Sequence, residues 1–293
     1  MLNKHKIEYY LFIFAGNLLS IFGFSSIRYS SQILAFIFFR ILRIRRKVVI
    51  TNLSKAFPEL NPKAIKQLAQ KNYRSAAISF LEIFNFKNFV KEEIHSLILP
   101  EGIEVVKSKL DEGKGLILLT AHIGNWELGA IAAGVYLNES IKVLIKKQKN
   151  PYVKNWLKDT RERFGNKQIS VGIKSARELI TVIRNNEMVG IVGDQRGPRT
   201  EGLRVEFFGQ QTSTFIGTAS IAIKTKCPVV VIFCIRQPNF KYKFVIEELN
   251  YKTELSNKEE LIKSFNQMYM KKLESIIRKY PDQWLWMHDI WKY

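Results

Sequence analysis

The sequence lacks the signatures of most enzymes that depend on cofactors or metals. Its 293 residues contain no phosphate-binding loop, no dinucleotide-binding fingerprint and no Gly-x-Ser-x-Gly elbow. Only four histidines occur, and His5, His95 and His288 are isolated from other potential ligands, so no metal-binding spacing is present. We therefore expect no metal site and no cofactor.

Cysteine is almost as scarce. The two cysteines, Cys227 and Cys234, lie in one apolar run that is typical of a buried strand. Seven residues apart in a strand, their side chains point to opposite faces and cannot form a disulfide with each other. We expect two buried free thiols in a reducing compartment.

Acidic residues are few relative to basic ones. Lysine and arginine number 46 against 26 aspartates and glutamates, for a net charge of +20. A strongly positive protein attracts polyanions, and three classes of partner are consistent with this charge: nucleic acid, an anionic membrane surface, or an acidic carrier protein or substrate. Charge alone does not choose among them.

The N-terminus is apolar but short. Residues 9–24 contain few polar side chains, and 16 residues at ~1.5 Å per residue give about 24 Å of helix, less than the ~30 Å of a hydrocarbon core. Basic residues flank the apolar stretch on both sides, which disfavours a single span. We expect residues 1–45 to form an interfacial or re-entrant membrane-associated helical segment with both ends cytoplasmic, and residues 46–293 to form one α/β domain. An uncleaved signal peptide and a buried core helix are the alternatives.

Strand-like and helix-like patterns alternate from about residue 100 onward. Strands are predicted at residues 116–121, 141–145, 188–193 and 229–235, with an edge strand at 241–248, and helices at 105–112, 126–136, 152–164, 174–185, 213–225 and 258–280. The alternation predicts an α/β fold with a mainly parallel central sheet flanked by helices. Chemistry in such sheets gathers at the carboxyl ends of the strands, where His122, Asp194 and Gln195 are placed.

The stretch of residues 116–130 is the strongest candidate for a catalytic site. In one continuous helix, His122 and Glu127 would lie on different faces. They meet only if His122 precedes a helix that begins near Glu127, with Gly124 in the turn and Asn125 as the N-cap. A histidine oriented by a carboxylate is suited to remove a proton from a hydroxyl near neutral pH. An ordinary structural histidine at a strand end is the alternative.

A second polar turn, Asp194-Gln195-Arg196, follows the predicted strand at 188–193. Its arginine suits phosphate or carboxylate oxygens better than a lysine would. Arg161 and Arg163, at the end of a predicted helix, are candidates for binding an anionic headgroup, or else they complement the helix C-terminus.

An aromatic pair lies between this turn and the next predicted helix. Phe207 and Phe208 precede a small-residue turn that contains Thr214. These three residues are candidates to line a groove for an acyl chain. A packed core position for the two phenylalanines is the alternative.

Together these motifs resemble the late lauroyl/myristoyl acyltransferases of lipid A biosynthesis, within the lysophospholipid acyltransferase superfamily. The resemblance runs almost the length of the chain, through the apolar N-terminus, Asn52-Leu-Ser-Lys-Ala-Phe-Pro-Glu59, the His-x4-Asp/Glu motif at His122 and Glu127, Arg161-Glu-Arg-Phe-Gly165, Asp194-Gln195, Phe207-Phe208-Gly209, Thr214 and the ending Pro281-Asp-Gln-Trp284-Leu-Trp286-Met-His288-Asp-Ile-Trp291-Lys292. The Phe-Pro-Glu-Gly block of glycerol-phosphate acyltransferases is missing after Asp194, which disfavours a glycerophospholipid acceptor.

The resemblance implies acyl transfer from an acyl-carrier-protein thioester to a hydroxyl of an anionic lipid A precursor at the cytoplasmic face of the inner membrane. His122 is then the general base and Glu127 its orienting carboxylate. Substrate binding is expected from Asn125, Arg161, Arg163, Asp194, Gln195 and Arg196. The backbone N–H groups of Gly124 and Asn125 are the nearest candidates to stabilise the oxyanion.

Two other readings stay open at the level of sequence. One is an acyltransferase that acts on another amphipathic acceptor, such as a glycolipid, an ornithine lipid or a lysophospholipid. The other is a basic peripheral membrane or nucleic-acid-binding protein without catalysis. Nucleic acid is disfavoured because the aromatic residues lie mostly in apolar runs rather than among basic ones.

Overall fold

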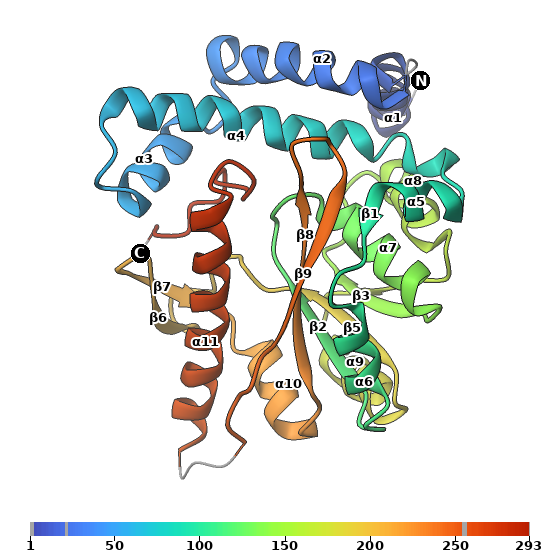
Figure 1. Ribbon diagram of the computed structural model, residues 1–293, viewed down its shortest axis with the longest axis vertical. Coiled ribbons are helices and arrows are strands. Elements are labelled where there is room, and N and C mark those ends of the chain that lie inside the picture. The colour runs from blue at the N-terminus through green and yellow to red at the C-terminus, as the bar shows by residue number, and fades with distance from the viewer. Residues whose placement is uncertain (1–2, 21–22, 254–256, 293) are drawn as a thin grey trace.

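A seven-stranded sheet forms the centre of the molecule (Figure 1). The computed structural model describes residues 3–20, 23–253 and 257–292. The strand order is β1 (Ile98–Leu99), β9 (Tyr242–Glu248), β8 (Val229–Arg236), β2 (Leu116–Thr120), β5 (Met188–Val192), β3 (Ile141–Ile145) and β4 (Lys167–Ser170). The five strands from β8 to β4 are parallel, so the predicted mainly parallel sheet is confirmed.

The predicted elements differ from the structure at several positions. Strand β9 pairs antiparallel with β8, but it is not at the edge, because β1 pairs with its outer side. Strand β4 is short and polar, and it was not predicted. A separate hairpin of β6 (Leu203–Phe207) and β7 (Gln210–Thr214) occupies the start of the helix predicted at 213–225, which therefore begins only at Gly217.

Helices cover both faces of the sheet and divide the interior into two cores. One core includes side chains from α5 (Lys91–Leu97), α6 (Ile103–Leu110), α7 (Trp126–Leu137) and α8 (Pro151–Glu162), and the other includes those from α3 (Arg46–Ala56), α9 (Ser175–Arg184), α10 (Gly217–Thr225) and α11 (Lys258–Lys279). Strand β2 supplies both cores: Leu116 and Leu118 face the first, and Ile117 and Leu119 face the second. Burial on both faces explains its unbroken apolar sequence.

Helix α4 (Pro62–Glu82) lies across one end of the sheet, with the N-terminal helices above it (Figure 1). These are α1 (Lys4–Ser20), α2 (Gly23–Phe36) and a π-helical turn at Ile37–Ile41. Residues 21–22 of the predicted apolar segment 9–24 lie outside the described residues. Among the helices described, none has the length and apolar character needed to cross a membrane.

The two cysteines are buried and free, as predicted. Cys227 precedes β8, and Cys234 lies within it. Burial raises the pKa of the Cys234 thiol, so this side chain remains protonated in the core.

Candidate active site

A tight turn joins β2 to α7 and presents His122. The helix begins at Trp126, so His122 precedes the helix that carries Glu127 in its first turn, as the sequence required. Gly124 has a φ of +60°, and a Cβ at this position would lie 1.9 Å from the carbonyl oxygen of Cys234. The side chain of Asn125 accepts a hydrogen bond from the N–H of Leu128 at 3.0 Å, which confirms the predicted N-cap.

The carboxylate that holds His122 is Asp194 and not the predicted Glu127. Nδ1 of His122 lies 2.7 Å from Oδ1 of Asp194, and the backbone N–H of His122 donates to Oδ2 at 2.8 Å. The indole of Trp284 also donates to Oδ2, at 2.7 Å. The pairing of His122 with Asp194 arises because β5, which precedes Asp194, lies directly beside β2.

The pKa values of this pair shift in opposite directions. Burial lowers the pKa of His122, but the charges of Asp194 and Glu127 and the bond to Asp194 outweigh it, and the net pKa lies above its usual value. Burial raises the pKa of Asp194, but His122 and the N–H donors around the carboxylate lower it by more. The net pKa of Asp194 therefore lies below its usual value, and the carboxylate is ionised. With Nδ1 bonded to a carboxylate, Nε2 is the ring nitrogen that can exchange a proton with another group.

Glu127 instead forms a bidentate ion pair with Arg161. Nε of the guanidinium lies 2.7 Å from Oε2 of Glu127, and Nη2 lies 2.5 Å from Oε1. The two side chains retain 18% and 20% of their exposure, and both line the same cavity as His122. The pair therefore places a guanidinium and a carboxylate, held against each other, on the wall of the cavity that His122 also lines.

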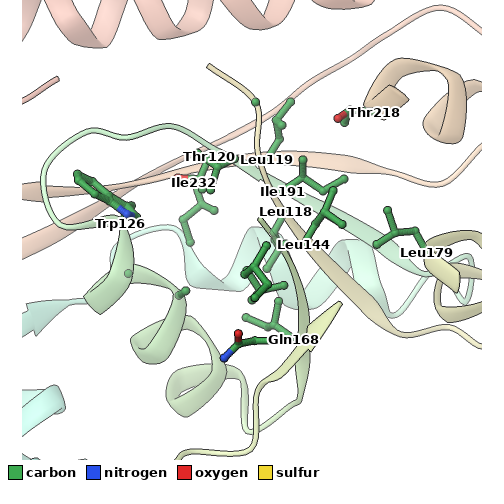
Figure 2. A pocket seen from close by; sticks show the side chains of 18 of the residues that line it. Leu118, Leu119, Thr120, Trp126, Leu144, Gln168, Leu179, Ile191, Thr218 and Ile232 are labelled. Carbon is green, nitrogen blue, oxygen red and sulfur yellow. The ribbon is translucent and has the colours of Figure 1, made fainter. Parts of the chain in front are cut away.

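The cavity beside His122 has a volume of about 750 Å³ and walls that are mainly apolar. It opens where the sheet splits: the pairing of β3 with β5 ends at Val143 and Gly190, although both strands continue. Leu144 and Ile191, just past the split, line the cavity together with Leu118 (Figure 2). A space of this size and polarity suits an aliphatic chain.

Other predicted binding residues divide into those that line this cavity and those that do not. Gln195 and Thr214 line it. Arg196 is held against the C-terminal segment: its backbone N–H donates to Nε2 of His288, and Nη1 donates to the carbonyl of Asp289. Arg163 lies outside the cavity and donates to the backbone carbonyls of Phe86 and Lys87.

Asn125 and the predicted oxyanion donors also require correction. Asn125 is fully buried, and its amide donates to Glu82 at 2.5 Å, so it supports the turn rather than a substrate. The N–H of Gly124 donates to the carbonyl of Gln283 at 3.1 Å, and that of Asn125 donates to the carbonyl of Cys234 at 3.0 Å. Both groups are therefore already used within the protein.

Phe207 and Phe208 belong to the core and not to an acyl groove. Each is at most 5% exposed, and neither lines the cavity. Their rings pack against one another and against tryptophans of the C-terminal segment, including Trp284 and Trp291. The alternative that these phenylalanines occupy core positions is the correct one.

Sequence reasoning gave no role to the residues that support the pair. In the sequence, Trp284 was noted only as part of a tryptophan-rich C-terminal segment, and nothing indicated its bond to Asp194. Tyr269 donates to the carbonyl of Thr120 at 2.7 Å, but in the sequence it showed only the spacing of a helical residue. In the part of the chain that the structure describes, no group of three or more His, Cys, Asp or Glu side chains is placed to hold a metal ion.

The chain matches proteins of one enzyme family along its length. A sequence model of that family, described as bacterial lipid A biosynthesis acyltransferase, matches residues 2–293. The lipid A biosynthesis lauroyltransferase of Escherichia coli (strain K12) is 24% identical over 255 residues, which cover 86% of this chain and 81% of the relative. The palmitoleoyltransferase of the same organism is 21% identical over 256 residues, covering 86% and 80%.

Another relative, with a different name, matches less than half of the chain. The phosphatidylinositol mannoside acyltransferase of Mycobacterium tuberculosis (strain H37Rv) is 27% identical over 139 residues, which cover 45% of this chain and 42% of the relative. Each of these relatives is named as a transferase of an acyl group, and the family match covers nearly every residue. The chain belongs to the bacterial lipid A biosynthesis acyltransferase family and is an acyltransferase.

Proposed function

We propose that this enzyme transfers a fatty acyl chain from an acyl-carrier-protein thioester to a hydroxyl group of an anionic lipid A precursor. The observation that carries the proposal is the pair of His122 and Asp194, with 2.7 Å between Nδ1 and Oδ1, at the edge of a large apolar cavity. Nε2 of His122 takes the proton of the acceptor hydroxyl as the oxygen attacks the thioester carbonyl. The tetrahedral intermediate then expels the thiolate, which receives the proton from the imidazolium.

Asp194 stabilises the imidazolium while the intermediate exists, a role that the sequence-based hypothesis gave to Glu127. Glu127 instead orients Arg161, whose guanidinium faces the cavity and binds an anionic group of the acceptor. The acyl chain occupies the apolar cavity between β3 and β5. Such direct transfer needs neither a covalent acyl-enzyme nor a metal ion.

The experiment that tests the function uses purified enzyme, a radiolabelled acyl-carrier-protein thioester and a lipid A precursor. We expect one labelled chain to appear in ester linkage on the acceptor, identified by mass spectrometry. A glycolipid acceptor such as a phosphatidylinositol mannoside is the second candidate, because a relative of that name matches part of the chain. Transfer to neither acceptor would contradict the proposal.

Residues 1–45 are proposed to hold the enzyme on the cytoplasmic face of the inner membrane, with residues 46–293 as the catalytic domain. Large apolar side chains of α1 and α2 stay exposed: Leu11 is 64% exposed, Phe14 is 67% and Ile33 is 64%. Arginines follow this surface directly, at Arg40 and in residues 43–46. Apolar side chains beside basic ones are typical of helices that lie in an anionic membrane interface.

Charged substitutions on this surface should weaken membrane binding. The triple variant Leu11→Glu, Phe14→Glu, Ile33→Glu is expected to lower partitioning onto anionic vesicles by about tenfold or more, because each side chain buries apolar area in the interface. Vesicle flotation measures this. The matched control is Val90→Glu with Leu99→Glu, two half-exposed apolar residues on other elements, which should float like the wild type. If the triple variant floats as well as the wild type, the proposal that this surface binds the membrane is wrong.

A bulky side chain in the split between β3 and β5 should change the preferred chain length. Leu144→Trp fills space beyond the last paired residues, so we expect the ratio of kcat/KM for short over long donors to rise by about tenfold. Competition between two labelled donors measures the ratio. Leu68→Trp, at a partly buried leucine of α4 outside the cavity, is the control and should leave the ratio unchanged. If the ratio is unchanged in Leu144→Trp, the acyl chain does not occupy the cavity between β3 and β5.

A further inference from the structure

The C-terminal segment after α11 runs along the carboxyl ends of the central strands, as the red loop below α4 in Figure 1. Trp284 forms an isolated antiparallel bridge with Ile123. On either side of this bridge, the N–H of Leu285 donates to the carbonyl of His122 at 2.9 Å, and the N–H of Gly124 donates to the carbonyl of Gln283 at 3.1 Å. The segment therefore holds the backbone of the turn that presents His122.

The same segment holds the other half of the pair through the indole of Trp284. Nε1 of Trp284 lies 2.7 Å from Oδ2 of Asp194, and the N–H of His122 occupies the same oxygen at 2.8 Å. Two donors on Oδ2 restrict rotation of the carboxylate, and Oδ1 is then directed at Nδ1 of His122, 2.7 Å away. A carboxylate with only one of these donors would rotate more freely.

The position of Trp284 is set by contacts that do not involve His122 or Asp194. The side-chain amide of Asn72 on α4 donates to the carbonyl of Trp284 at 2.6 Å. Gln283 pairs with both backbone groups of Arg236 at the end of β8, at 2.9 Å each. The indole is 1% exposed and packs against Phe207 and Trp286. The donor is therefore fixed before any substrate binds.

We propose that Trp284 is a positioning residue for the reaction: its indole N–H holds Asp194 in the rotamer that orients His122 as a base. This inference rests on the proposed roles of His122 and Asp194. It extends them to a residue 90 positions away from Asp194 along the chain. The indole acts on the rate through the carboxylate and has no contact with substrate of its own.

Trp284→Phe compared with Trp286→Phe tests the proposal. Both tryptophans are buried in the same aromatic cluster, and each donates one indole hydrogen bond, but Trp286 donates to the carbonyl of Pro281. A bond to a charged group contributes more than one to a neutral carbonyl, so we expect Trp284→Phe to lower kcat by about tenfold or more and Trp286→Phe by about twofold at most. KM for donor and acceptor should stay within about twofold in both.

The pH profile separates positioning from a general loss of packing. A carboxylate that swings away no longer raises the pKa of His122, so the acid limb of kcat/KM should move to lower pH in Trp284→Phe and stay in place in Trp286→Phe. Equal kcat in the two variants, or an unmoved limb in Trp284→Phe, would overturn the inference. Melting temperatures of both variants establish that they fold.

A second substitution covers the case in which Trp284→Phe does not fold. Incorporation of 3-benzothienylalanine at position 284 keeps the shape of the indole and replaces its N–H by sulfur, so the same fall in kcat and the same shift of the limb are expected. Wild-type kcat in this protein would overturn the inference. His122→Asn and the wild type in the same assay separate the possible failures. If the wild type transfers no acyl chain, the proposed function fails, and if His122→Asn is as active as the wild type, the proposed role of His122 fails. If His122→Asn is inactive and Trp284→Phe matches Trp286→Phe, only the role of Trp284 fails.

Discussion

His122→Asn is expected to lower kcat for acyl transfer by about 10³-fold, because it removes the proposed general base. The amide nitrogen of the asparagine takes approximately the place of Nδ1 and can still donate to Asp194, which otherwise would remain ionised and buried without this partner. The variant is therefore expected to fold, whereas His122→Ala would combine lost catalysis with lost stability. Initial rates of label transfer at saturating donor and acceptor measure the effect.

His95→Asn is the matched control for this variant. The ring of His122 packs edge-on against Trp126, and that of His95 packs in the same way against Tyr136. His95, however, lies on α5 and does not line the cavity. It should retain wild-type kcat. Transfer by His122→Asn at a rate near that of His95→Asn would mean that another group accepts the proton, and the proposed mechanism would then be wrong.

Asp194→Asn should also have a large effect, a fall in kcat of about 10²- to 10⁴-fold. The substitution keeps the shape of the side chain and removes the charge that stabilises the imidazolium, and an amide nitrogen facing Nδ1 would favour the wrong tautomer of His122. Because Asp194 raises the pKa of His122, its loss should also move the acid limb of kcat/KM to lower pH. A general base must be neutral to accept a proton, so we expect the activity of the wild type to fall as the pH drops through the raised pKa of His122.

Asp282→Asn provides the comparison for Asp194→Asn. Asp282 lies in the C-terminal segment that carries Trp284. Its backbone carbonyl accepts the hydrogen bond from Asn72, and the substitution leaves this carbonyl intact. Its kcat and its pH profile should match those of the wild type. If Asp194→Asn kept both the rate and the position of the acid limb, the carboxylate would have no role in orienting or charging His122, and the assignment of this pair would be rejected.

The local features of the site were predictable from sequence because neighbours along the chain determine them. An apolar run, a glycine and an asparagine sufficed to place His122 before the helix and Asn125 at its N-cap, and the structure confirms both. Gly124 is required by the backbone conformation of the turn itself. The ordered set of motifs also identified the family, which the match over residues 2–293 confirms.

Contacts between distant segments were not predictable in this way. Glu127, five residues from His122, was the natural partner by proximity in sequence, yet Asp194 is the carboxylate that bonds to Nδ1. Asp194 reaches His122 because of the strand order: β5 lies beside β2, and the carboxyl ends of both strands meet at one edge of the sheet. The N–H groups of Gly124 and Asn125 were likewise predicted to stabilise the oxyanion. Their actual partners, the carbonyls of Gln283 and Cys234, lie more than a hundred positions later in the chain, so the sequence did not reveal them.

The stretch around His122 by itself determined a strand, a turn and a helix, and the whole sequence determined the parallel α/β class and the enzyme family. Only the tertiary structure decided which carboxylate orients the histidine, that Phe207 and Phe208 are core residues, and that the apolar cavity lies where β3 parts from β5. The physical reason is the range of the interactions. Periodicity, capping and turn geometry act over a few residues, whereas the partner of a buried charge and the walls of a cavity come from segments that meet only when the sheet has formed.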